Sequence, residues 1–86
     1  MSSIQTQLNR FISQPLRVAV KQSSDTSPDT DQRTFFGRLI TIDNEANLIL
    51  TDTSEVRSRQ GVRTHQRYVG MVVVKGDDIE SVGIAC

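Results

Sequence analysis

The chain has 86 residues, which corresponds to one domain and is too short to build a typical substrate pocket alone, so we do not expect an enzyme. Ten basic and ten acidic residues cancel, which disfavours a protein that depends on non-specific phosphate contacts. No apolar run approaches the roughly 20 residues of a membrane span, and residues 1–11 lack the apolar core of a signal peptide. Cys86 is the only cysteine. We therefore expect no membrane association and a reducing compartment, the cytoplasm, with the nucleus as the alternative.

The N-terminal segment predicts a short helix over about residues 3–13. Pro15 would end this helix, and a serine at its start would cap it. The apolar residues that recur at helical spacing are Ile4, Leu8, Phe11 and Ile12. This spacing gives the helix one apolar face.

Two strands follow, separated by an acidic segment. Residues 16–21, LRVAVK, alternate apolar and polar side chains, as a half-buried strand does. Residues 22–32 contain three Asp and no basic or large apolar residue, which predicts a flexible loop. Residues 33–42 predict a longer strand, and Gly37 in its interior indicates a sharp bend or a close backbone approach.

After a polar turn at residues 43–47, residues 48–53 predict another strand, and residues 54–66 predict a polar basic loop. The loop is either a solvated connection or a contact surface for RNA or an acidic protein. The basic residues that would make this contact are Arg57, Arg59, Arg63 and Arg67. The lone His65 has no Cys or His nearby with which to build a metal site.

Residues 67–76 and 79–85 predict two final strands joined by a tight turn at Lys75–Asp78. The run Met71–Val74 is apolar on both faces, whereas a strand with one solvated face should alternate. We interpret this run as evidence for stable association through the last two strands. One helix followed by five short antiparallel strands favours a small barrel of the OB or SH3-like type.

Two separated segments, 37-GRLITIDNEANLILTD-52 and 69-VGMVVVKGDDIESV-82, resemble the bipartite motif of the Sm/Lsm family. In the first half the matching residues are Gly37, Leu39, Asp43, Asn47, Leu48 and Leu50. In the second half they are Val74, Lys75, Gly76, Asp77 and Ile79. The sequence lacks a Gly-rich phosphate loop, an HExxH motif and any other catalytic constellation.

This resemblance implies a fold and an assembly. The fold would be an N-terminal helix capping a strongly bent five-stranded antiparallel barrel. Family members assemble by pairing the fourth strand of one subunit with the fifth strand of the next, which would explain the apolar fourth strand. The expected interface residues are Leu8, Phe11, Ile12, Met71, Val72, Val73, Val74, Ile79, Val82 and Ile84.

The resemblance also implies a nucleotide site, in degenerate form, made of Asp43, Glu45, Asn47, Lys75 and Gly76. In RNA-binding members an aromatic residue or His stacks on a base, and here that position is Glu45. An Arg covers the other side of the base, and here that position is Lys75, which lacks a planar guanidinium. Since stacking is worth about 1–3 kcal/mol per base, we expect RNA binding to be weak or absent.

One branch of the family, the small Sm-like auxiliary subunit of the NatC N-terminal acetyltransferase, is similar in length and in its apolar VGMVVV strand. It implies a non-catalytic subunit that joins a catalytic subunit and a large scaffold subunit, with no cofactor of its own and acetyl-CoA on the catalytic partner. Ribosome association is a further expectation. The alternative is an Lsm ring subunit that binds U-rich RNA in mRNA decay or splicing.

Overall fold

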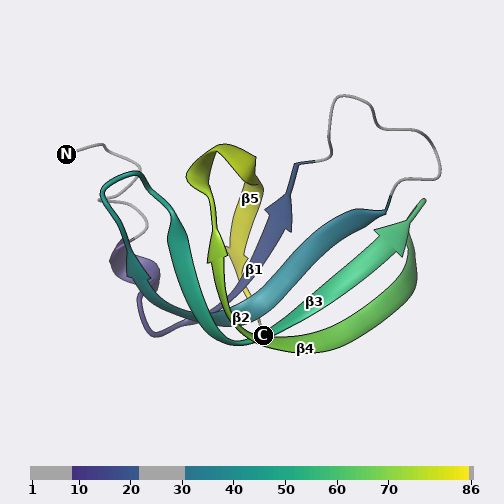
Figure 1. Cartoon of the computed structure of the whole chain (residues 1–86), viewed down its shortest axis with the longest axis horizontal. Coiled ribbons are helices and arrows are strands. Elements are labelled where there is room, and N and C mark those ends of the chain that lie inside the picture. Colours follow the sequence, from purple (N-terminus) through teal and green to yellow (C-terminus); the bar gives the residue numbers. More distant parts are fainter. Residues whose placement is uncertain (1–8, 22–30, 86) are drawn as a thin grey trace.

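The computed structural model describes residues 9–21 and 31–85 (Figure 1). These residues form five β-strands and two short 3-10 turns, which confirms the prediction of a mostly β chain with five antiparallel strands. In chain order the elements are η1 (Asn9–Phe11), β1 (Pro15–Val20), β2 (Gln32–Ile42), β3 (Leu48–Arg59), β4 (Val62–Val74), η2 (Gly76–Asp78) and β5 (Ile79–Ile84).

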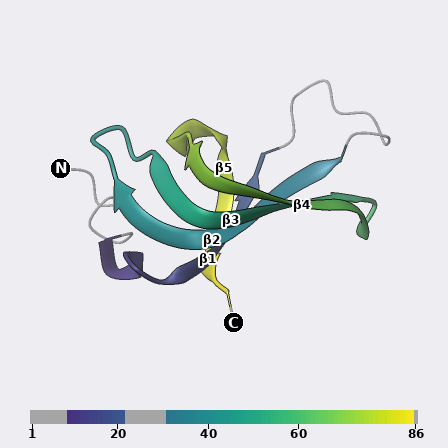
Figure 2. The same cartoon turned by 60° about the horizontal axis from the view of Figure 1, so that its bottom comes forward.

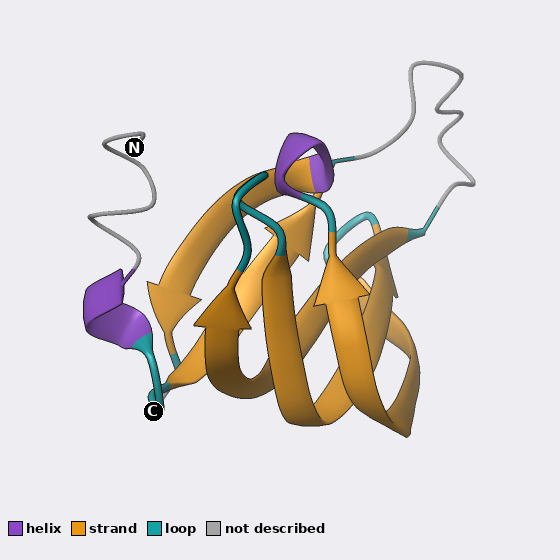
Figure 3. Ribbon diagram, turned by 60° about the vertical axis from the view of Figure 1, so that its left-hand side comes forward, coloured by secondary structure: helices purple, strands orange, loops and turns teal. Residues whose placement is uncertain are grey.

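The strands form one antiparallel sheet in the order β4-β3-β2-β1-β5. The first four strands follow one another as a meander, and β5 returns to pair with β1. The sheet is strongly curved, so that β5 lies across the hollow side of the longer strands (Figures 2 and 3). The turn predicted at Lys75–Asp78 is present as η2, but it does not close a hairpin, because β4 and β5 occupy the two edges of the described sheet.

The core lies inside this curve. Alternate side chains of each strand point to one face, and the fully or nearly buried ones converge there. This core cluster consists of Leu16, Val18, Phe35, Leu39, Leu48, Leu50 and Val74. A small core of this kind leaves little margin of stability, so losses of packing in it should be felt by the whole domain.

β2 and β3 approach each other closely at Gly37. A Cβ atom on Gly37 would lie 2.3 Å from the Thr53 Oγ1 atom and 3.1 Å from the Thr51 carbonyl oxygen. The pairing register shifts at this level between β2 and β3 and again between β3 and β4, where Gly70 has a φ of 78°. Such bulges increase the local bend. The predicted close approach at Gly37 is therefore confirmed.

The predicted N-terminal helix over residues 3–13 is not supported. Residues 3–8 lie outside the described residues, and Asn9–Phe11 form a single 3-10 turn. Ser13 has a φ of 71°, and its backbone N–H donates to the Leu39 carbonyl at 2.7 Å. The chain thus leaves the helical conformation to join β2. Within the described ranges, no helical segment has the length and apolar character needed to cross a membrane.

The predicted loops also need correction. Of the acidic loop 22–32, residues 22–30 lie outside the described residues, and Gln32 already belongs to β2. The prediction of a loop over residues 54–66 was wrong, because these residues continue β3 and begin β4. Gln60 and Gly61, with φ of 52° and 81°, form the two-residue turn between them, as in a type I′ hairpin. Polar side chains on both faces of this hairpin conceal the alternation that identifies a strand.

Gly37→Ala should destabilise the domain by about 1–3 kcal/mol, because its methyl group would overlap the fully buried Thr53 side chain and approach the Thr51 carbonyl oxygen. Gly83→Ala in β5 is the matched control, because a Cβ there meets only the Arg17 Nη2 atom at 3.7 Å. Urea unfolding measures both variants. Equal stability of the two would contradict the close contact at Gly37.

Candidate functional site

The loop between β2 and β3 is organised by the Asp43 carboxylate. Its Oδ1 atom accepts hydrogen bonds from the backbone N–H groups of Glu45 at 2.8 Å and Asn47 at 2.9 Å. The backbone adds a bond from the Ala46 N–H to the Asp43 carbonyl at 3.1 Å. An Asp that accepts bonds from residues shortly after it is a common turn device, and here it fixes the loop conformation.

Asn47 connects this loop to the segment after β4. Its Nδ2 atom donates to the Asp43 Oδ2 atom at 2.8 Å, and its Oδ1 atom accepts the Gly76 backbone N–H at 2.9 Å. A Cβ atom on Gly76 would lie 2.7 Å from the Ala46 carbonyl oxygen, so the two segments meet closely only because residue 76 is glycine. We call the set Asp43, Asn47 and Gly76 the loop tie.

The structure thus brings together the predicted nucleotide-type residues, but the positions that would hold a base are poorly suited to it. Glu45 and Lys75 are both exposed beside the loop tie. A carboxylate provides no stacking surface, and Lys provides a point charge without a planar fork. At these two positions a base would therefore meet the Glu45 carboxylate and the Lys75 ammonium group, and neither provides a planar group on which the base could stack.

The outer face of β4 is the main exposed apolar surface among the predicted interface residues. Val74 is buried in the core and Val72 packs against it, whereas Met71 and Val73 point outward with 66% and 59% of their surface exposed. Only one face of the apolar run Met71–Val74 therefore packs in the core, and the other face is exposed. β4 also lies at an edge of the described sheet.

The remaining predicted interface residues divide in the same way. Phe11, Ile79 and Val82 pack against the core cluster. Ile12 and Ile84 are exposed, and Leu8 lies outside the described residues. The available apolar side chains are therefore separated between the β4 face and the region around η1 and the end of β5.

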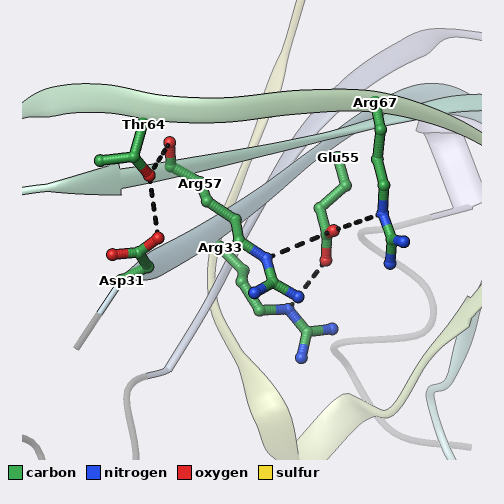
Figure 4. A network of polar contacts seen from close by, with 6 residues as sticks. All are labelled: Asp31, Arg33, Glu55, Arg57, Thr64 and Arg67. Atoms are coloured by element: carbon green, nitrogen blue, oxygen red, sulfur yellow. Dashed lines mark hydrogen bonds and ion pairs between the residues drawn. The ribbon is translucent and has the colours of Figure 1, made fainter.

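The four arginines predicted as a contact surface do not act as one group. Arg59 pairs with Asp31 at 2.9 Å, and Arg63 donates to the Gln66 side chain at 2.9 Å. Arg57 and Arg67 instead approach the carboxylate of Glu55, together with Arg33 (Figure 4).

The sequence reasoning missed Arg33 and Glu55. The signal that could have found them is the alternation of charge along two strands, with Glu55 and Arg57 two residues apart and so on one face. Among the described residues, no three His, Cys, Asp or Glu side chains are arranged to hold a metal ion.

The model of the LSM domain matches residues 30–84, which is most of the chain. The chain belongs to the LSM domain family. The matched region begins just before β2 and ends with β5, and it includes both segments of the loop tie. A search of curated proteins with the sequence finds no match.

Solved structures of similar fold include chains of the NatC complex and Sm proteins. A chain of the NatC complex bound to CoA is 23% identical with a TM-score of 0.65, over 91% of this chain and 83% of that one. A chain of the NatC complex bound to Gag peptide and CoA is 26% identical with a TM-score of 0.64, over 91% and 90%. The Pyrococcus abyssii Sm protein in complex with a uridine heptamer is 21% identical with a TM-score of 0.64, over 93% and 94%.

The hydrogen bonds of the loop tie hold the pKa of the Asp43 carboxyl below its ordinary value. The backbone N–H of Asn47 contributes most, followed by the Asn47 side chain, and the backbone N–H of Glu45 adds to them. Because the folded pKa is lowered, the stabilisation from this carboxylate is complete above the unfolded value of about 3.9. It is lost as the pH falls through the folded pKa.

Asn47→Ala should raise the pKa of Asp43 toward the ordinary value, because the carboxylate loses the Asn47 side-chain donor. It should also destabilise the domain at neutral pH by about 1–3 kcal/mol, because the part-buried Gly76 N–H loses its acceptor. A carbon-detected NMR titration of the Asp43 carboxyl and urea unfolding measure the two effects. Glu45→Gln is the control, because it leaves all these donors in place and should not raise the pKa. An unchanged pKa in Asn47→Ala would contradict the assigned cause.

Proposed function

We propose that this LSM domain is a non-catalytic auxiliary subunit of a NatC-type N-terminal acetyltransferase complex. The observation that carries the proposal is the outward face of β4, where Met71 and Val73 expose apolar side chains on an edge strand. Exposed apolar edges are a liability in a chain that stays alone and are expected where another chain pairs with them. The likeness to chains of the NatC complex supports the choice of assembly.

The proposed mechanism of assembly is addition of a strand to a sheet edge. In the described sheet, β4 and β5 each have one side without a neighbouring strand, so their backbone N–H and C=O groups on that side are available to a partner. Backbone pairing would supply the alignment, and burial of Met71 and Val73 would supply much of the affinity. Ile12 and Ile84 would extend the contact near η1.

In this proposal the chain holds no cofactor and carries out no chemical step. Acetyl-CoA would be bound by the catalytic subunit, and a large scaffold subunit would be the second partner. The role of this chain would be to stabilise the other two, in the cytoplasm and at the ribosome. The exposed Glu45 at the stacking position supports a function that does not depend on reading a base.

A second candidate function is that of an Lsm ring subunit that binds U-rich RNA. The intact loop tie favours it, because the segments that would surround a nucleotide are held together. The fold is also that of the Pyrococcus abyssii Sm protein solved with a uridine heptamer. In such a ring this subunit would contribute contacts from Asn47 and Lys75, with neighbouring subunits supplying most of the affinity.

Val73→Asp should abolish assembly and change the stability of the isolated domain by less than about 1 kcal/mol, because the side chain is exposed. Val74→Asp should instead unfold the domain, because it places an unpaired charge in the core, at about 3–5 kcal/mol. Co-purification with partner chains and thermal unfolding separate the two effects. If Val73→Asp still assembles, the β4 face is not the interface.

Affinity purification of the endogenous protein followed by mass spectrometry separates the two functions. We expect an acetyltransferase and a large scaffold protein in amounts equal to the bait. Recovery of six other Lsm proteins with U-rich RNA would overturn the first proposal and support the second. If the isolated chain binds oligo-U and Asn47→Ala abolishes this binding, the Lsm ring function is likewise supported.

A further inference from the structure

A buried carboxylate surrounded by three guanidinium groups lies on the inner face of the long β3–β4 hairpin (Figure 4). The Glu55 side chain is only 4% exposed. Its Oε2 atom lies 3.1 Å from Arg33 Nε, and its Oε1 atom lies 3.1 Å from Arg67 Nε and 3.5 Å from Arg57 Nε. We call Arg33, Arg57 and Arg67 with Glu55 the arginine cluster.

The strand register explains why these residues meet. Arg33 of β2 pairs with Arg57 of β3, which pairs with His65 of β4. One row further along the same face, Glu55 pairs with Phe35 on one side and with Arg67 on the other. Since Phe35 is a core residue, this face continues the hollow side of the sheet. The cluster therefore begins where the apolar core ends.

The charges of the cluster do not balance. Three guanidiniums face one carboxylate, which leaves two positive charges in excess. Each arginine approaches Glu55 through its Nε atom, and Figure 4 shows the guanidiniums of Arg33 and Arg57 on one side of the carboxylate and that of Arg67 on the other. The arginine side chains are 48%, 43% and 68% exposed, so a second anion can reach them.

Two cavities open onto the cluster and share Glu55 and Arg67. The smaller, of about 250 Å³, is completed by Arg57 and His65. The larger, of about 390 Å³, is lined on its polar side by Arg33, Lys75 and Asp78 besides the shared pair. Its three cationic side chains exceed its two carboxylates by one charge. Its apolar side includes the valine wall, which we define as Val20, Val69 and Val72.

We propose that the arginine cluster binds an acidic peptide segment of a partner protein, with a carboxylate on the Nη atoms of Arg33 and Arg67 and an adjacent aliphatic side chain against the valine wall. Arginine forks match carboxylates in geometry as well as in charge. The neutral net charge of the chain gives no general attraction for a polyanion, so a local charge excess selects a local acidic group.

An acidic peptide fits this site better than RNA does. Single-stranded RNA is usually held by aromatic rings on which bases stack. The aromatic residue of the larger cavity, Phe35, is 5% exposed and already lies under the Arg33 guanidinium at 5.3 Å. A nucleotide has no aliphatic group that could pack against the valine wall, whereas a leucine, isoleucine or valine side chain of a peptide could.

This inference deepens the proposed function by naming the chemistry of a partner contact. It separates the four arginines predicted from sequence into two pairs. Arg57 and Arg67 belong to the cluster, whereas Arg59 and Arg63 are engaged with Asp31 and Gln66. Asp31 also accepts a hydrogen bond from Thr64 at 2.8 Å, which ties the start of β2 to the hairpin. Replacing Arg59 and Arg63 together therefore provides a control that removes the same charge outside the cluster.

The test is fluorescence anisotropy of the full chain with a labelled peptide in which glutamate and leucine alternate, at physiological ionic strength. The double variant Arg33→Gln/Arg67→Gln should weaken binding by at least about tenfold, as expected for two lost charged hydrogen bonds. The double variant Arg59→Gln/Arg63→Gln, which loses the same two charges outside the cluster, should change it by less than about twofold. Equal losses in both variants, or equal binding of a glutamine–leucine peptide, would overturn the proposal.

Three further measurements control for misfolding and test the RNA alternative. The Arg Nε–Hε NMR signals of the wild-type chain should shift for the cluster arginines as the peptide is added, and no shift would overturn the proposal. Oligo-U that binds more tightly than the peptide, with the same dependence on Arg33 and Arg67, would also overturn it. Arg33→Lys should keep the fold and still weaken peptide binding, because it keeps the charge and removes the fork.

These outcomes are independent of the acetyltransferase assignment. Peptide binding through Arg33 and Arg67 with recovery of Lsm partners alone would support this site and overturn the proposed function. Recovery of the acetyltransferase without any binding of the peptide would support the proposed function and overturn the peptide site.

Discussion

The close contact between Gly37 and Thr53 is the constraint on which the rest of the molecule depends. Because no side chain separates β2 from Thr53, the long strands bend sharply at one level, and the register shifts there extend into β4. The bend encloses the core between the two halves of the sheet and carries β5 back to β1. It also leaves β4 and β5 as the edges of the described sheet, and these edges are the surfaces proposed for assembly.

The loop tie shows how a family motif can persist for structural reasons. The two polar groups of the Asn47 amide are both used within the chain, one by Asp43 and one by Gly76. Removing either contact would leave a part-buried donor or acceptor unpaired, which is costly whether or not RNA binds. The presence of Asn47 and Gly76 is therefore weak evidence for RNA binding. The exposed Glu45, which makes no such structural bond with its side chain, is the more informative residue.

The long hairpin of β3 and β4 gives the fold a second kind of surface. Near the bend its inner face is apolar and belongs to the core, and further out the same face carries Glu55 and its arginines. A buried carboxylate is tolerated here because three guanidiniums offset its desolvation. Their excess charge then faces the adjoining cavities. An apolar edge and a basic inner face on one strand suit a subunit that holds a partner in a defined orientation.

Sequence pattern alone predicted five antiparallel strands and a bend or close approach at Gly37, because period-two alternation and glycine are local signals. That the two motif halves lie together was implied only by the family resemblance. The pattern could not decide which valines of Met71–Val74 face outward, since both faces of that run are apolar and only packing on Leu48 and Leu50 separates them. It misassigned residues 54–66, where both strand faces are polar. Charge alternation could have placed Glu55 and Arg57 on one face, but it could not have brought Arg33 and Arg67 to them, because these residues lie on three strands that meet only through their pairing register. Long-range register is a property of the folded sheet, and it was the tertiary structure that turned scattered charges into a site.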